Sequence, residues 1–581
     1  NRTLLYLLVF ALFAALPWSA QSGGILLGAH SVAIAVVALY TLGDLAASTD
    51  PELGLIRGRL VEPTGYQNAT AALLLASFFP ALLLASRREV PWWARGVLLA
   101  AAGILVEVAI LPQSRGSVIV APLVAIAFVA LAPGRTRLVL TAVPVAVAAL
   151  LAHQPLLDVY SVVVDGGDVR AAFDEAFAAV AVSAVALLAA GCGIGLIERR
   201  AVVPARVARA TSRVLAALAV AGSVVGVVVA LNATGNPVDW LDERWEDFKS
   251  GDPGQIEASS RFGGTLGSNR YDFWRVALDE FSDEPVTGVG MDQFAVDYVR
   301  ERRSDEEPTN PHSLEVKILS QTGVVGAALL GAFLVLTVTA AVRVRVRAGD
   351  SLAGAVAAGG TIALVYWFVH GSADWFWEFP GLTMPVLAWI AIAGAVGPAG
   401  ERARRRERPR HATRVALAAV VAITATAAVA TLALPWGAAR DTEIAAENWP
   451  ADPDAAFERL DRARGLNPLD DTPDAVAGTI ALRLGDGERA LTYFEEAAER
   501  NPHNWYSQLM LGSLAATRGD RAEALRFLRS ASELNPDDQL IRDAIAGARR
   551  GTALRPAAID RELQLRVCAR VGRTSATPEC E

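Results

Sequence analysis

An ionisable histidine stands at the start of a long apolar stretch near the middle of the chain. His312 lies in the run Pro311-His-Ser313, and the apolar residues that follow carry glycines at positions 323 and 326. Imidazole exchanges protons near neutral pH, so a histidine where an apolar helix meets water is a candidate for functional chemistry. The first turns of this stretch are also too polar to face lipid, which predicts that they face protein or a water-filled cavity.

Arginines at the membrane boundary are the second group of candidates. Arg115 lies between two apolar blocks with almost no loop, Arg270 precedes Tyr-Asp-Phe-Trp274, and Arg59 lies in a polar connection. A guanidinium stays charged when partly desolvated, and its planar fork of donors suits a diphosphate group. Pairing with carboxylates or lipid headgroups is the alternative for each arginine.

His370 and Asp374 are secondary candidates, because they precede two tryptophans in the run from His370 to Trp377. Tryptophans at this depth usually form the interfacial belt of a membrane protein, although they can also stack on sugar rings. The acids Asp44, Asp50 and Glu52 resemble a metal site only weakly, since charges commonly flank a membrane span. We therefore predict no metal site.

The elements that position these residues belong to a polytopic membrane protein. The chain has 581 residues, 53% of them hydrophobic, with a mean hydropathy of +0.34, and the apolar residues come in blocks. A spanning helix needs about 20 apolar residues, and about twelve blocks qualify. The blocks are residues 4–20, 25–47, 68–86, 96–112, 117–133, 138–153, 173–197, 213–232, 314–342, 352–370, 379–398 and 415–435.

Arginines cluster on alternate connections, which predicts the topology by the positive-inside rule. The predicted cytoplasmic connections hold residues 87–88, 135–137, 199–209, 343–347 and 402–410. The predicted extracytoplasmic ones are 48–67, 113–116, 154–172, 233–313, 371–378 and everything after about 436. All candidate site residues then lie on the extracytoplasmic side. Asn1 would also lie outside, so we expect either a preceding span or one miscounted block.

The tail has a different character. Asn-Pro pairs recur at 467, 501 and 535, an interval of 34 residues, and amphipathic helical pairs lie between them. This is the tetratricopeptide pattern, which predicts a membrane domain (1–436), a repeat domain (437–552) and a C-terminal tail (553–581). Such repeats usually hold a protein partner or another copy, and shielding of the catalytic loop is the alternative. A disulfide between Cys568 and Cys580 is compatible with an extracytoplasmic tail.

The chain resembles the O-antigen ligase and polymerase family of membrane glycosyltransferases. The resemblance covers roughly residues 20–400, and its motifs occur in the family's order. They are Gly65 to Asn68, the Ser114-Arg115-Gly116 step, the Arg270 to Trp274 stretch with Pro285 to Gly290, and His312-Ser313 with Gly323 and Gly326. One departure is Ile119, where the family usually has leucine.

The resemblance implies an all-α, GT-C-type glycosyltransferase of the bacterial cytoplasmic (inner) membrane. Its donor would be a glycan on undecaprenyl diphosphate, and its acceptor a hydroxyl-bearing lipid, glycan or protein at the extracytoplasmic face. By analogy, Arg115 and Arg270 would bind the diphosphate, and His312 would act as base toward the acceptor hydroxyl or orient it. The expected partners are membrane lipids and a protein that binds the repeats. No cofactor, metal or nucleic acid is expected.

Other readings stay open. Ligases, polymerases and protein O-oligosaccharyltransferases share these motifs, so the sequence does not separate them. A transporter or flippase of lipid-linked sugars could use His312 and Arg115 as substrate or proton sites, but the chain lacks the inverted repeats and paired broken helices that such proteins often show. A scaffold that merely anchors the repeats would need no arginines at the membrane boundary.

Overall fold

The structure is a computed structural model that describes residues 2–200, 237–250, 269–304, 306–396 and 411–571. The chain divides into two units. The membrane unit comprises Tyr6–Asp292 and Asn310–Arg408, and the repeat unit comprises Asn1–Leu5, Gln293–Thr309 and Pro409–Glu581. The loop segment Gln293–Thr309 thus groups with the repeats, although its neighbours on both sides in sequence belong to the membrane unit.

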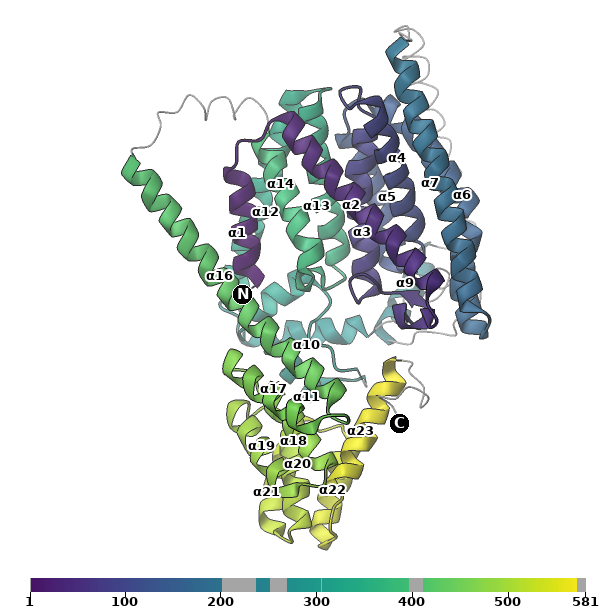
Figure 1. Ribbon diagram of the computed structural model, residues 1–581. Helices are drawn as coiled ribbons and strands as arrows, with labels where there is room; N and C mark the ends of the chain where they lie inside the picture. The colour runs from purple at the N-terminus through teal and green to yellow at the C-terminus, as the bar shows by residue number, and fades with distance from the viewer. Residues whose placement is uncertain (1, 201–236, 251–268, 305, 397–410, 572–581) are drawn as a thin grey trace. The chain divides into compact units, whose positions relative to one another are not determined.

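Apolar helices stand side by side in the membrane unit (Figure 1). Six of the described helices are long and apolar enough to cross a membrane. They are α2 (Ala20–Ala47), α3 (Gln67–Ala85), α6 (Arg135–Asp165), α7 (Val169–Arg200), α12 (Leu314–Ala348) and α13 (Leu352–Gly371). Shorter apolar helices are α1 (Arg2–Ala15), α4 (Trp92–Val108), α5 (Arg115–Leu131) and α14 (Pro380–Ala395). The helical membrane fold is confirmed, but the count of about twelve spans is not, and block 213–232 lies outside the described residues.

The connections between spans gather in two groups at opposite ends of the membrane unit. At one end, Arg87 pairs with Asp350 at 2.5 Å, and Arg95 pairs with Glu198 at 2.9 Å. At the other end, strands β1 (Leu55–Ile56) and β2 (Arg59–Leu60) form a hairpin, and Leu60 N–H donates to the carbonyl of Leu111 at 3.3 Å. Which of these two ends faces the cytoplasm stays a prediction from the arginine pattern.

Helix α12 is broken at Gly323, where the backbone has φ 59° and ψ −163°. The loop 285–289 fills the break: Val324 N–H donates to Pro285 O, and Val289 N–H donates to Ser320 O, both at 2.9 Å. The loop and the helix cross so closely that a Cβ on either Gly288 or Gly323 would overlap backbone atoms of the other segment. Gly288 and Gly323 therefore both permit the close crossing of the loop and the helix.

Replacing Gly288 by alanine is expected to destabilise the membrane unit by about 3 kcal/mol or more. Overpacking costs about 1–3 kcal/mol and a left-handed residue with a Cβ about 1–2 kcal/mol, and Gly288 has φ +70°. Gly65→Ala is the matched control, because Gly65 has φ +79° but nothing within 4 Å of the added Cβ. The thermal unfolding midpoint of both variants in detergent measures the difference, and equal midpoints would contradict the crossing.

The repeat unit contains the predicted helical pairs. These are α18 (Thr472–Arg483) with α19 (Gly487–Arg500), and α20 (Trp505–Thr517) with α21 (Arg521–Leu534). Helices α16 (His411–Asn448) and α17 (Pro453–Leu466) precede them, and α22 (Gln539–Arg550) follows. Ala490 and Ala524 are fully buried, and Gly485 and Gly519 have φ of +81° and +83° in equivalent turns. The tetratricopeptide prediction is confirmed. The last helix, α23 (Pro556–Val571), contacts α18 and α20.

Candidate active site

Four helix N-termini and one connection meet at one end of the membrane unit. The helices are α3, α5, α10 (Arg270–Asp283) and α12, and the connection joins α13 to α14 through the short helix η3 (Phe376–Glu378). Helix α10 lies across this end of the bundle (Figure 1). The free N–H groups of a helix N-terminus attract negative charge, so their convergence favours an anion.

Asp374 is the centre of the polar network at this end. Its side chain is 1% exposed and accepts hydrogen bonds from Tyr66 Oη at 3.0 Å, Asn68 Nδ2 at 2.7 Å and Arg270 Nη2 at 3.2 Å. The backbone N–H of Trp375 donates a further bond at 2.9 Å. A buried carboxylate needs such partners to stay ionised. Asp374 therefore joins the starts of α3 and α10 to the α13–α14 connection.

His312 lies beside this network in a strained backbone conformation. Its φ is +54°, a region that residues with a Cβ seldom occupy and that recurs at functional sites. The ring packs between Phe273 and Trp375, at centroid distances of 5.3 and 5.4 Å. Trp375 in turn contacts the ring of Tyr66. The imidazole is thus held by aromatic side chains on two sides.

The hydrogen bonding of His312 selects one tautomer. Nδ1 lies 2.9 Å from the carbonyl oxygen of Asn310, and a carbonyl only accepts, so Nδ1 carries the proton and Nε2 keeps its lone pair. Burial lowers the pKa of His312 to about 4, a shift that Asp374 opposes and Arg270 increases. The neutral imidazole can therefore accept a proton at Nε2 near neutral pH.

Lys317 and Glu378 fix the two segments that carry His312 and Asp374. Lys317 Nζ donates to Asn310 Oδ1 at 2.6 Å and forms an ion pair with Glu378, and both side chains of that pair are less than a tenth exposed. Breaking one partner of a buried pair leaves an uncompensated charge. Sequence reasoning noted only that the first turns after His312 are polar, and it missed the pairing of Lys317 with Glu378. A lysine within an apolar helix was the signal that a buried acid must lie nearby.

Arg270 is the first residue of α10, and its side chain remains 26% exposed while pairing with Asp374. Pairing with a carboxylate, the alternative reading of this arginine, thus occurs here. Helix α10 is anchored beneath it, because Ser320 of α12 donates to Glu280 at 2.6 Å. On its other side, Phe248 of α9 (Pro237–Ser250) packs against Trp274. Arg270 is therefore held in place and still reachable.

Gly116, which follows Arg115 at the start of α5, lies against His370. Arg115 begins α5 after the capping residue Ser114, and a Cβ on Gly116 would overlap the His370 ring. His370 Nδ1 lies 3.2 Å from Tyr366 Oη, and among the described residues its Nε2 has no hydrogen-bond partner. The glycine of the Ser-Arg-Gly step thus permits the close approach of the histidine. His370 bonds to Tyr366, while Asp374 serves the Arg270 cluster.

Arg59 lies in the β1–β2 hairpin, which is joined through Leu60 to the turn that precedes Arg115. The acids Asp44, Asp50 and Glu52 are exposed. Within the described ranges, no group of three or more His, Cys, Asp or Glu side chains is placed to hold a metal ion. The structure thus brings His312, Arg270 and Asp374 into one cluster, with Arg115 and His370 at the same end of the bundle.

Sequence reasoning missed the roles of Tyr66 and Asn68 as donors to Asp374. Both lie in the Gly65 to Asn68 motif, but their partner is more than 300 residues away in sequence. Burial and the charge of Asp374 raise the pKa of Tyr66 far above its usual value, so the phenol stays a donor. A cluster of polar residues at the start of an apolar helix was the only signal available.

Comparison with known proteins identifies two family models that match parts of the chain. The family model for O-antigen ligase matches residues 176–331, and a model for tetratricopeptide repeats matches residues 476–538. No curated protein matches the chain. The resemblance to the O-antigen ligase family is thereby confirmed over a range that contains Arg270, Gly288, His312 and Gly323. Arg115, His370 and Asp374 lie outside the matched range.

Proposed function

We propose that the chain transfers a glycan from a polyprenyl diphosphate to an acceptor hydroxyl at the extracytoplasmic face of the membrane. The match to O-antigen ligase supports glycan transfer by a membrane enzyme in general. The observation that carries the finer proposal is His312, whose Nδ1–H is bound to Asn310 and whose ring lies beside the Arg270–Asp374 pair. A neutral base and a reachable guanidinium thus lie in one site.

In the proposed reaction, the acceptor oxygen attacks the anomeric carbon of the sugar, and the bond from that carbon to the diphosphate breaks. The hydroxyl proton passes to Nε2 of His312. The departing diphosphate is stabilised by Arg270 and Arg115 and by the convergent helix N-termini, which need no reorganisation as charge develops. Arginine and histidine can supply both functions without a metal ion.

The charge distribution supports the extracytoplasmic side. Arg87, Arg95 and Arg137 form ion pairs at the end of the membrane unit opposite His312. Arg345 binds backbone carbonyls at that same end. An excess of arginine marks cytoplasmic connections, and this supports an outward-facing site end.

Reconstitution tests the proposal. The purified chain in nanodiscs is given an undecaprenyl-diphosphate-linked oligosaccharide as donor and a bacterial envelope extract as source of acceptors. We expect release of undecaprenyl diphosphate with attachment of the glycan to an acceptor, unchanged by EDTA. Chain lengthening would identify a polymerase, and a single addition a ligase. Movement of intact donor across a liposome membrane without cleavage would overturn the proposal in favour of a carrier.

The pH dependence of transfer should reflect the lowered pKa of His312. The base must be neutral, so activity is lost as pH falls through the folded-state pKa of about 4 rather than through the ordinary value of 6.5. We expect kcat/KM for the donor to stay level between pH 8 and about 5.5. Tryptophan fluorescence over the same range checks that the fold persists. A half-maximal rate at pH 6–7 in the folded protein would contradict this environment of His312.

A further inference from the structure

The loop segment Gln293–Thr309 is built to dock on the repeats. Its helix α11 (Phe294–Glu301) has only 8 residues, and isolated helices shorter than about 12 residues are marginal in water. Yet Phe294 and Tyr298 are fully buried, and α11 contacts α21 of the repeats. The repeat unit therefore supplies the surface that this short helix needs.

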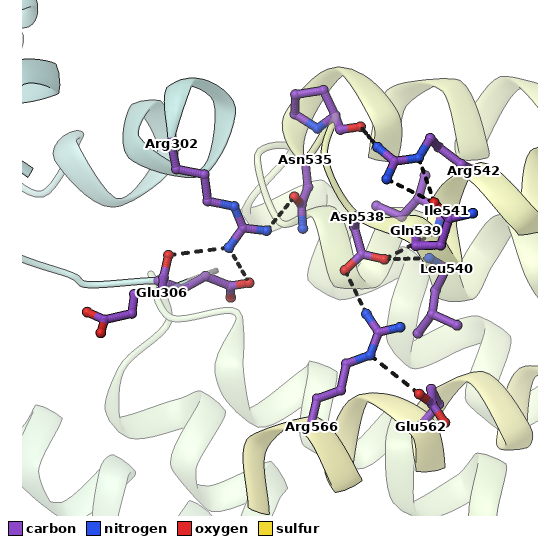
Figure 2. A network of polar contacts seen from close by, with 12 residues as sticks. Arg302, Glu306, Asn535, Asp538, Gln539, Leu540, Ile541, Arg542, Glu562 and Arg566 are labelled. Carbon is purple, nitrogen blue, oxygen red and sulfur yellow. Dashed lines mark hydrogen bonds and ion pairs between the residues drawn. The ribbon is translucent and has the colours of Figure 1, made fainter. Parts of the chain in front are cut away.

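Arg302, directly after α11, makes the polar contact of this docking. Its Nη2 donates to Asn535 Oδ1 at 2.9 Å, and its Nη1 donates to Glu307 Oε1 at 2.8 Å and to the carbonyl of Glu306 at 3.3 Å (Figure 2). Arg302 is 8% exposed and Asn535 is fully buried. A buried guanidinium cannot lose its charge, so it requires these acceptors.

Asn535 occupies a repeat position whose side chain, in the repeat before it, forms a hydrogen bond within the repeats. It is the asparagine of the third Asn-Pro pair, and it ends α21 just as Asn501 ends α19. The side chain of Asn501 donates to Asp471 of its own repeat at 3.2 Å. The side-chain N–H₂ of Asn535 has no partner in the part of the chain that the structure describes, and its carbonyl oxygen binds Arg302.

The contact lies close to His312 along the chain. Glu307 is held by Arg302, and Asn310 is held by Lys317, so only Pro308 and Thr309 separate two anchored residues. Proline fixes one of the backbone torsions of this link. The backbone carbonyl of Asn310 in turn accepts a hydrogen bond from Nδ1–H of His312. The covalent link between the docked loop segment and the residue that binds His312 is therefore only two residues long.

We propose that the tetratricopeptide repeats bind the chain's own loop segment as their ligand, and that Arg302 is the positioning residue through which they set the place of His312. The positioning role rests on the proposed function of His312. The docking itself does not, because it concerns only contacts within the repeat unit.

The experiment uses the full chain in nanodiscs and two readouts: amide hydrogen exchange of peptides covering α11, and transfer kinetics. Arg302→Ala is expected to raise exchange in α11 and to lower kcat about 10- to 100-fold, with KM for the donor within about 2-fold, because misplacing a reacting group costs rate more than binding. Arg300→Ala is the control, since Arg300 is exposed and, among the described residues, forms its ion pair with Asp297 on its own helix.

A second pair of variants keeps the proposal testable if Arg302→Ala fails to fold. Asn535→Ala should act like Arg302→Ala, whereas Asn535→Asp should keep both readouts at wild-type level. The aspartate retains the acceptor, adds a charge facing Arg302, and gives up only an N–H₂ that donates to nothing described. Unchanged exchange in both alanine variants would overturn the docking. Raised exchange with unchanged kcat would overturn the positioning role while leaving the proposed function intact. A wild-type chain without transfer would remove the positioning role together with the proposed function, and exchange would still decide the docking.

Discussion

The His312→Ala chain is expected to insert and fold normally and to lose about 10²–10⁴-fold in the rate of glycan transfer, the usual contribution of a general base. His312 bonds to one backbone carbonyl and packs on two rings, so the deletion removes little else. Single-turnover release of undecaprenyl diphosphate by the purified protein measures the loss. Retained transfer would remove the assignment of His312.

A glutamine at the same position separates proton transfer from packing. His312→Gln can keep a hydrogen bond to Asn310 and fill part of the space between Phe273 and Trp375, but it cannot accept a proton near neutral pH. We expect it to be as inactive as alanine. If the glutamine variant recovers most of the rate, then His312 orients the acceptor and does not act as base.

Replacing Arg270 by alanine is expected to cost about 10²–10³-fold in kcat, because it removes a preorganised charge from the departing diphosphate. Arg270→Lys should recover only part of this loss, since an ammonium lacks the planar fork. The effect should grow when Arg115 is also replaced. The measurement is donor turnover at saturating donor, with donor binding followed separately.

Arg275 provides the matched control on the same helix. It lies five residues after Arg270 and pairs with Asp272 at 2.9 Å and Asp279 at 3.4 Å, so it already has its counter-charges within α10. Arg275→Ala should leave turnover within about 2-fold, in keeping with the small contribution of a partly exposed ion pair. Equal losses for both variants would show that α10 needs its charges for folding and not for the reaction.

The sequence predicted which residues lie at the site end because arginine sidedness and apolar length act locally. His312, Arg270 and Arg115 could thus be placed at the same end without knowing any contact. Asp374 could not be placed at the centre of the network, because its donors Tyr66 and Asn68 are brought to it by packing across the bundle. The tie between Lys317 and Glu378 was hidden for the same reason.

The loop 233–313 shows another limit of sequence reasoning. By pattern it is a single long connection, and a lid over the site is the natural interpretation. In the structure, α10 anchors to α12 through Glu280 and Ser320, whereas α11 groups with the repeats. Which surface an 8-residue amphipathic helix chooses depends on complementary side chains elsewhere in the chain, and periodicity carries no information about them.

The break at Gly323 divides α12 into a short portion next to His312 and a long apolar portion. Residues 324–348 extend roughly 37 Å at 1.5 Å per residue, enough to cross the hydrocarbon core of a bilayer unaided. The loop 285–289 bonds to both sides of the break, at Ser320 on the His312 side and at Val324 and Val325 on the other. We therefore expect the loop 285–289 to keep the start of α12, next to the imidazole, in place when a thicker or thinner bilayer changes the tilt of the span.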